Sequence, residues 1–208
     1  MVSLRLTPAT MTLHGRRVQL RTLSEGDYEG WVGVRQRCRD WLLKWEPRSQ
    51  YAAHLPEDRR SFVNRCSVRE RERQMGTGFG FGIFFEHRFV GEITLSSIQR
   101  GPLQSAYIGY WIDEAVAGRG LMPEAVVIML QYAFDSLRLH RIEIAIIPRN
   151  TPSRRVVEKL GLRFEGVAER YLEIDGTWED HARFAITAEE WEVSAPELVS
   201  NWLLPLHD

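Results

Sequence analysis

Cysteine is scarce in this chain, and the pattern of the few that it has excludes several classes of protein. The two cysteines among 208 residues, Cys38 and Cys66, make neither a disulfide framework nor a zinc-binding spacing. We expect both to be reduced thiols in a cytoplasmic protein. The six histidines also lack the spacing of metal ligands, so no metal site is expected.

Long apolar runs and an excess of either charge are absent as well. No segment approaches the ~20 apolar residues that a transmembrane helix needs, and residues 1–15 lack the apolar core of a signal peptide. The formal net charge is −1, so no membrane association and no direct nucleic-acid binding are expected. The composition is that of an ordinary globular protein, with no repeat and no low-complexity tract. The length of 208 residues suits one domain with a full core.

The most informative stretch runs from residue 107 to residue 137. Aromatic and β-branched residues predict a strand from Tyr107 to Ile112. An acidic turn follows, and then residues 117–120, Ala-Gly-Arg-Gly, which we call the glycine loop. A helix is predicted directly after it, because apolar residues recur there at helical spacing, at Ala125, Ile128, Met129, Tyr132 and Ala133.

This order of strand, glycine loop and helix suits the binding of an anion. The first amides of a helix have no internal partner, and glycines on both sides of Arg119 allow a phosphate to approach the backbone. The dinucleotide-binding fingerprint fails because Pro123 stands where its third glycine belongs, and no Gly-Lys-Ser/Thr follows as in a Walker loop. The local pattern therefore suits a pyrophosphate site, although by itself it is more typical of a plain turn before a helix.

The glycine loop resembles the acyl-CoA-binding motif of the GNAT N-acetyltransferases, usually written Gln/Arg-x-x-Gly-x-Gly/Ala. In the register Ala117-Gly118-Arg119-Gly120-Leu121-Met122 the two central positions match that motif, whereas Ala117 departs from its Gln/Arg position and Met122 from its last small residue. Methionine at the last position is familiar in one branch, the RimJ/RimL-type ribosomal-protein N-terminal acetyltransferases. Further segments resemble that branch, nearest to its RimJ type: Trp45-Glu46-Pro47, residues 149–162 and residues 164–181.

The resemblance covers roughly residues 12 to 191 and implies an α/β (α+β) fold. This GNAT fold has a mixed, mostly antiparallel sheet with splayed central strands and flanking helices. We expect a GNAT N-acetyltransferase domain at residues 12–193 and a C-terminal tail at residues 194–208, which packs on the domain or on a partner subunit. Periodicity predicts strands at 17–22, 79–85, 89–97, 107–112, 141–147, 164–170 and 183–187, and helices at 24–37, from Pro56 to about 73, at 121–137 and at 153–160.

Two segments before the sheet have more than one interpretation. Trp41 and Trp45 are four residues apart and share a face of a helix, either as core packing or as a wall of the acceptor pocket. The charged residues from Arg65 to Arg73 are interpreted as the solvated face of the second helix.

The resemblance implies acetyl-CoA as the cosubstrate, with its pantetheine arm between the splayed strands. In the family the residue at Asn150 faces the cofactor and the one at Ser153 lies near the thioester sulfur, where its hydroxyl can donate to the leaving thiolate. Pure capping of a helix is the alternative for both. The expected acceptor pocket contains Trp45, Tyr107 and Tyr171. The expected cofactor-binding residues are Tyr110, Trp111, Ile112, Gly118, Arg119, Gly120, Leu121, Met122, Asn150, Ser153 and Arg155.

The general base is open at this stage. An α-amino group has a pKa near 7.7–8.0, so on the order of a tenth of it is neutral at pH 7 and a distant carboxylate acting through water suffices. Glu92 is the first candidate, although Arg170 stands where some relatives place a carboxylate. The candidates for the base are Glu92, Asp113, Glu114, Glu169 and Glu173. For each of them the alternative is an ordinary solvated charge on the surface.

The sequence therefore predicts direct transfer of an acetyl group from acetyl-CoA to a primary amine. The resemblance favours the N-terminal amine of a protein beginning with Ala or Ser, such as a ribosomal protein, in the cytoplasm. Two alternatives stay open: acetylation of a small-molecule amine or a Lys side chain, and a catalytically silent acyl-CoA-binding module. The protein is expected to be a monomer or a homodimer.

Overall fold

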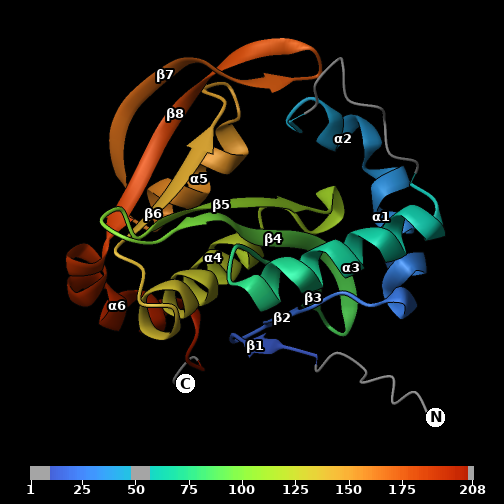
Figure 1. Cartoon of the computed structure of the whole chain (residues 1–208), viewed down its shortest axis with the longest axis horizontal. Coiled ribbons are helices and arrows are strands. Elements are labelled where there is room, and N and C mark those ends of the chain that lie inside the picture. The colour runs from blue at the N-terminus through green and yellow to red at the C-terminus, as the bar shows by residue number, and fades with distance from the viewer. Residues whose placement is uncertain (1–9, 48–56, 206–208) are drawn as a thin grey trace.

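The computed structural model describes residues 10–47 and 57–205. Within them, one eight-stranded sheet runs through the molecule in the order β1-β2-β3-β4-β5-β6-β8-β7 (Figure 1). All neighbouring strands are antiparallel except β5 and β6. The strands are β1 (Thr12–His14), β2 (Val18–Arg21), β3 (Phe79–Phe85), β4 (Arg88–Gln99), β5 (Ser105–Ile112), β6 (Arg141–Ile146), β7 (Arg163–Ile174) and β8 (Thr177–Thr187).

Helices cover both faces of this sheet. Ser24 and Asp27 bond to each other before α1, as the capping pattern predicted, and Asp58 caps α3 by accepting from the Ser61 amide. The predicted helix start at Pro56 lies outside the described residues, and the described helix begins at Arg59. The helices are α1 (Tyr28–Arg37), α2 (Arg39–Leu43), α3 (Arg59–Met75), α4 (Leu121–Gln131), α5 (Thr151–Lys159) and α6 (Ala188–Trp202).

The two central strands separate from each other, as predicted. β5 and β6 pair in parallel only where Ser105 to Tyr107 face Arg141 to Glu143. β5 then continues to Ile112 and β6 to Ile146 without further pairing between them. This opening between the strands is the splayed centre of the GNAT fold.

Alternation along the strands divides the core into two clusters. Ile93 of β4 belongs to the large cluster with α4, whereas its neighbour Glu92 points toward α3 on the opposite face. The predicted apolar stripe of α4 is wrong in its extent, because every residue from Leu121 to Leu130 is buried. The sheet covers one side of α4 and α6 covers another, so no solvated face remains.

The C-terminal segment packs on the domain itself. α6 runs continuously past residue 194, so the expected boundary between residues 193 and 194 falls inside this helix. Leu198 is buried in the large core cluster, and Trp202 packs against it. The Arg16 side chain donates hydrogen bonds to the carbonyls of Ser200 and Leu204, which fixes the end of α6 beside β1.

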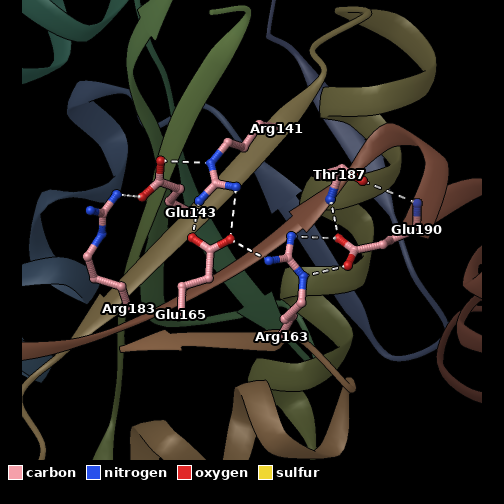
Figure 2. Close-up of polar contacts among 7 residues, drawn as sticks. All are labelled: Arg141, Glu143, Arg163, Glu165, Arg183, Thr187 and Glu190. Atoms are coloured by element: carbon pink, nitrogen blue, oxygen red, sulfur yellow. Dashed lines mark hydrogen bonds and ion pairs between the residues drawn. The ribbon is translucent and has the colours of Figure 1, made fainter. Parts of the chain in front are cut away.

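A ladder of ion pairs joins the strands at the C-terminal half of the sheet to α6 (Figure 2). Glu143 of β6 accepts from both Arg141 and Arg183, and Glu165 of β7 accepts from Arg141 and from Arg163. Arg163 also reaches Glu190, the residue that completes the capping box of α6 with Thr187. Three arginines thus balance three glutamates, and the ladder explains why these charges tolerate partial burial.

Candidate functional site

A cavity of about 650 Å³ lies along the part of β5 that no longer pairs with β6. Its lining comes from β4, β5, the glycine loop, the start of α4, the start of α5 and the segment around α2. Segments more than 100 residues apart in the sequence therefore meet in one space. From the glycine loop and its neighbours the lining includes Val116, Ala117, Gly118, Gly120, Leu121, Met122 and Pro123. From α2 and the residues after it the lining includes Trp41, Leu42, Trp45, Glu46 and Pro47.

The glycine loop has a backbone that only glycine adopts without strain. Gly118 has φ +79° and Gly120 has φ +80°, both in the left-handed region. A Cβ on Gly120 would also lie 3.3 Å from the Arg17 side chain and 3.4 Å from Trp202. No side chain of the described residues caps the N-terminus of α4, which follows directly. The amides of its first turn are thus directed toward the cavity end where an anion fits.

Polar contacts with Arg17 and Val18 hold the glycine loop and the start of α4 in place. Glu124, in the first turn of α4, accepts hydrogen bonds from the amides of Arg17 and Val18 at 2.5 and 2.8 Å. The Arg17 side chain donates to Glu124 at 3.1 Å and to the carbonyl of Arg119 at 3.1 Å. The start of β2 therefore fixes both the loop and the helix that follows it.

Most of the predicted cofactor-binding residues meet in this cavity. Among the described residues, all eleven of that prediction line it except Arg119. The Arg119 side chain is exposed, and its guanidinium lies 5.1 Å from the ring centre of Phe85, outside the lining. Arg119 is therefore the one residue of that prediction whose side chain the structure leaves outside the cavity.

Asn150 and Ser153 lie at the start of α5, beside β5. The Asn150 side chain caps the helix, because its Oδ1 accepts from the Ser153 amide at 3.2 Å. The Ser153 hydroxyl lies 3.0 Å from the phenol oxygen of Tyr110, which in turn lies 3.3 Å from the Ser153 carbonyl. Burial raises the pKa of the Tyr110 phenol, and its hydrogen bond with Ser153 opposes that effect only in part. This pair of hydroxyls lies in the cavity wall.

Trp41 and Trp45 form another part of the cavity lining, which we call the tryptophan wall. Trp41 and Trp45 both line the cavity, and the Lys44 ammonium lies 5.5 and 5.3 Å from their ring centres. Arg149, just before α5, lies 5.5 Å from the ring centre of Trp45 and donates two hydrogen bonds of 2.7 Å to Glu179 of β8. The wall is thereby tied to the β7–β8 hairpin.

A β-bridge between backbones also connects the segment after Trp45 to the β7–β8 hairpin. Pro47 pairs with Ile174, which is buried at the end of β7, and the hairpin tip reaches over α2 (Figure 1).

Tyr107 and Tyr171 were also expected in the acceptor pocket, but neither belongs to the described residues that line the cavity. The hydrogen bond with Tyr171, together with burial, raises the pKa of Tyr107 to about 12. Of the expected acceptor-pocket residues, the structure therefore brings only Trp45 into the cavity.

Glu92 is a buried carboxylate in the cavity wall, held by cations. Its oxygens accept from Trp31 Nε1 at 2.6 Å, from Arg69 at 2.7 Å and from Arg65. Burial raises the pKa of Glu92, but the charges of Arg69 and Arg65 and the hydrogen bond from Trp31 outweigh it and lower the pKa. Glu92 is thus a poor proton acceptor. The interpretation of residues 65–73 as a solvated face is wrong at Arg65 and Arg69, which turn toward Glu92.

The other carboxylates considered as a base lie outside the cavity. Asp113 is buried beyond the end of β5, where Arg37 and Cys38 bond to it, and these contacts lower its pKa against the opposing effect of burial. Glu114 and Glu169 are exposed, and like Glu173 they do not line the cavity among the described residues. Glu46 does line it and is paired with Arg35.

Sequence reasoning missed Glu46 as a site carboxylate and also missed the polar residues of β4. Thr94 and Ser96 line the cavity on the same side as Glu92, at the period of two that a strand imposes. That alternation in the sequence is the signal that would have found them. No cluster of three or more potential metal ligands occurs among the described residues.

The cavity combines three chemical features. An uncapped helix start with a left-handed glycine loop has the geometry that suits a phosphate. The part of β5 beyond Tyr107 has no pairing with β6, which leaves backbone groups for an extended amide-containing chain, and the hydroxyl pair of Tyr110 and Ser153 lies in the same cavity wall. No described helix is both long and apolar enough to cross a bilayer. Such a site suits a group transfer from a phosphate-bearing donor to an acceptor that enters beside the tryptophan wall.

Comparisons with known proteins agree with this geometry. A family model described as "Acetyltransferase (GNAT) domain" matches residues 17–163. The [Ribosomal protein uS5]-alanine N-acetyltransferase of Escherichia coli (strain K12) is 32% identical over 155 residues, which are 74% of this chain and 78% of that protein. The ribosomal-protein-serine acetyltransferase of the same organism is 30% identical over 164 residues, 78% of this chain and 88% of the relative.

A solved structure matches nearly the whole chain. The structure of Mycobacterium smegmatis RimJ in complex with CoA-disulfide superposes with a TM-score of 0.84 at 35% identity. The match covers 92% of this chain and 93% of the RimJ chain.

Proposed function

Since this chain belongs to the GNAT family and is therefore an acetyltransferase, we propose that it transfers the acetyl group of acetyl-CoA to the N-terminal amine of a protein. The proposed acceptor begins with Ala or Ser, as in a ribosomal protein, and transfer is direct within a ternary complex in the cytoplasm. The names of the relatives support the acceptor class, since one acts on an alanine of a ribosomal protein and another is a ribosomal-protein-serine acetyltransferase.

The observation that carries the proposal is the junction of the glycine loop with α4. Its left-handed glycines and uncapped helix start suit the pyrophosphate of acetyl-CoA, which the amides from Gly118 to Met122 would hold. Backbone groups of Tyr110 to Ile112 would hold the pantetheine arm, because β5 has lost its pairing with β6 there. Arg155, also in the lining, would meet the phosphate of the adenosine end.

The proposed chemistry needs an amine positioned over the face of the thioester carbonyl and a hydrogen-bond donor beside the leaving sulfur. The amine attacks the carbonyl carbon, the new N–C bond forms, and the C–S bond breaks with its electron pair on sulfur. Backbone amides near Gly109 to Ile112 would stabilise the carbonyl oxygen as charge develops there. Ser153 would donate a hydrogen bond to the sulfur, which is worth roughly tenfold to a thousandfold in rate for a charge developing in a dry site.

The acceptor amine needs little help from a base. An α-amino group with a pKa near 7.7–8.0 is neutral in on the order of a tenth of molecules at pH 7, and a Lys side chain in only about one in a few thousand. The cavity supplies no unpaired carboxylate among the described residues, since cations hold both Glu46 and Glu92. This arrangement favours an N-terminal amine, whose proton leaves through water, over a Lys side chain.

Intact-mass spectrometry of a peptide panel incubated with the protein and acetyl-CoA tests the proposal. The panel holds Ala-, Ser- and Met-initiated peptides and one with a blocked N-terminus and an internal Lys. We expect one added acetyl group on the Ala- and Ser-initiated peptides alone. Acetylation of the internal Lys, or of a small amine but no peptide, would contradict the acceptor class while leaving the family intact.

A further inference from the structure

The hydroxyl groups of Tyr110 and Ser153 form a closed pair in the cavity wall. The Ser153 Oγ lies 3.0 Å from the Tyr110 phenol oxygen, and that oxygen lies 3.3 Å from the Ser153 carbonyl. Both side chains line the cavity between β5 and α5. Among the described residues, Ser153 is the hydrogen-bonding partner that the structure gives to the Tyr110 phenol.

Two arrangements of the protons fit these same oxygen positions. In the first, Ser153 donates to Tyr110 and Tyr110 donates to the Ser153 carbonyl, so the only proton of the serine hydroxyl is used within the pair. In the second, Tyr110 donates to Ser153, and the serine proton is free to point into the cavity. Rotation about two C–O bonds converts one into the other, with no movement of a heavy atom.

We propose that Tyr110 is the positioning residue that turns the Ser153 hydroxyl toward the sulfur of the cosubstrate and keeps it there as the thiolate forms. This inference rests on the proposed function, because it assigns Ser153 to the leaving group. The phenol donates to Ser153, and Ser153 donates to sulfur. Donation from Tyr110 makes the serine a stronger donor, because chains of hydrogen bonds polarise one another.

The same geometry defines what the pair does not do. A thiol has an ordinary pKa of about 8.5 and a phenol of about 10, and burial raises the pKa of Tyr110 further. A thiolate is therefore a weaker base than the anion that proton transfer from Tyr110 would leave. The electron pair of the broken C–S bond stays on sulfur, and CoA leaves as a thiolate with two hydrogen-bonded hydroxyls in series behind it.

The acidity of the thiol of bound CoA measures this pair without any acceptor. Ultraviolet absorbance of the thiolate, followed against pH in the complex of the protein with CoA, gives the fraction ionised. We expect Ser153→Ala to make the bound thiol roughly tenfold weaker as an acid, and Tyr110→Phe to make it about threefold weaker. The double variant should match Ser153→Ala alone, because Tyr110 acts through the serine.

Tyr132→Phe is the matched control, since it removes a phenol hydroxyl that packs beside Phe79 and Phe81, away from the cavity lining. It should leave the bound thiol at its wild-type acidity. Wild-type acidity in Tyr110→Phe, or effects that multiply in the double variant, would overturn the inference. Failure of the peptide panel would overturn only the proposed acceptor class. Absence of CoA binding to the wild-type protein would overturn both the proposed function and the role of Tyr110.

In turnover the same variants should separate kcat from KM. We expect Tyr110→Phe to lower kcat about tenfold while the KM for acetyl-CoA stays within about twofold, because the hydroxyl acts on a charge that develops only in the transition state. A rise in KM with an unchanged kcat would mean that Tyr110 merely shapes the cavity. Equal melting temperatures of the variants would show that the changes do not come from folding.

Discussion

Glu124 and Arg17 are 107 residues apart in the sequence, and their contact fixes the glycine loop. The Glu124 side chain is fully buried in the first turn of α4, where it accepts hydrogen bonds from the Arg17 amide and side chain and from the Val18 amide. Arg17 also donates to the carbonyl of Arg119 within the loop. The start of β2, which lies between β1 and β3 in the sheet, thus holds the loop that is proposed to bind an anion.

Removal of the Glu124 side chain should mainly affect stability, whereas removal of the Arg17 side chain should mainly affect the KM for acetyl-CoA. Glu124→Ala removes the acceptor of the buried Val18 amide and of the part-buried Arg17 amide, so we expect the free energy of unfolding to fall by about 3 kcal/mol. Arg17→Ala removes a side chain that is 41% exposed, so its stability cost should stay below about 1 kcal/mol. Its main effect should be a roughly fivefold rise in the KM for acetyl-CoA, equivalent to about 1 kcal/mol of binding.

Chemical denaturation and steady-state kinetics measure the two effects. Arg88→Ala, an exposed arginine at the β3–β4 turn, is the control for a lost positive charge. An unchanged KM in Arg17→Ala would show that the Arg119 carbonyl needs no such support.

The glycine loop makes a second prediction. Gly120→Glu should abolish acetyl-CoA binding, because it puts bulk and negative charge where the phosphate belongs and forces a side chain onto a backbone with φ +80°. Isothermal titration with acetyl-CoA measures the loss. Gly101→Glu carries the same backbone strain, at φ +68° in the β4–β5 turn, and should bind normally. Normal binding by a folded Gly120→Glu protein would refute the anion site.

The buried carboxylate Glu92 predicts how stability depends on pH. Its pKa is lower in the folded than in the unfolded chain, because Arg69, Arg65 and Trp31 outweigh the opposing effect of burial. The unfolded chain therefore binds more protons between the two values, so this stabilisation is present above the ordinary glutamate pKa of 4.5 and is lost as the pH falls through the folded pKa.

Glu92→Gln should remove that part of the pH dependence and lower the free energy of unfolding near neutral pH by about 3 kcal/mol, since two arginines lose their anion. Urea denaturation from about pH 3 to about pH 7 measures both effects. Glu70→Gln, which breaks a near-surface pair with Arg73, should cost less than about 1 kcal/mol. Loss of the acidic limb of the kcat profile in Glu92→Gln would instead identify Glu92 as the base.

Arg149 tests the tryptophan wall. Because its side chain is 54% exposed, its pair with Glu179 adds little stability, and Arg149→Ala should leave the free energy of unfolding within about 0.5 kcal/mol. The loss of its cation–π contact with Trp45 should raise the KM of the peptide acceptor about fivefold without changing that of acetyl-CoA. Arg73→Ala, on α3, is the control. A change in the KM of acetyl-CoA alone would place the role of Arg149 at the cofactor end.

The sequence predicted the elements well where one local pattern dominates. Alternating and aromatic residues predicted β3, β4 and β5, and the Asp175-Gly176 turn predicted the β7–β8 hairpin, although its strands extend to Ile174 and from Thr177. Gly118 and Gly120 were recognisable because a left-handed backbone restricts the residue type. The position of Ser153 in the first turn of α5 also followed from its neighbours in the chain.

What only the tertiary structure decided is which side chains meet. Charge gave no sign that Arg65 and Arg69 leave the solvent for Glu92, since a buried ion pair depends on a partner 20 or more residues away. The stripe on α4 became a fully buried helix because α6 covers its other side. The Tyr110–Ser153 pair likewise exists only because β5 and α5 pack together. Local geometry is set by the backbone preferences of a few adjacent residues, whereas a site is set by distances between segments that only the packed core fixes.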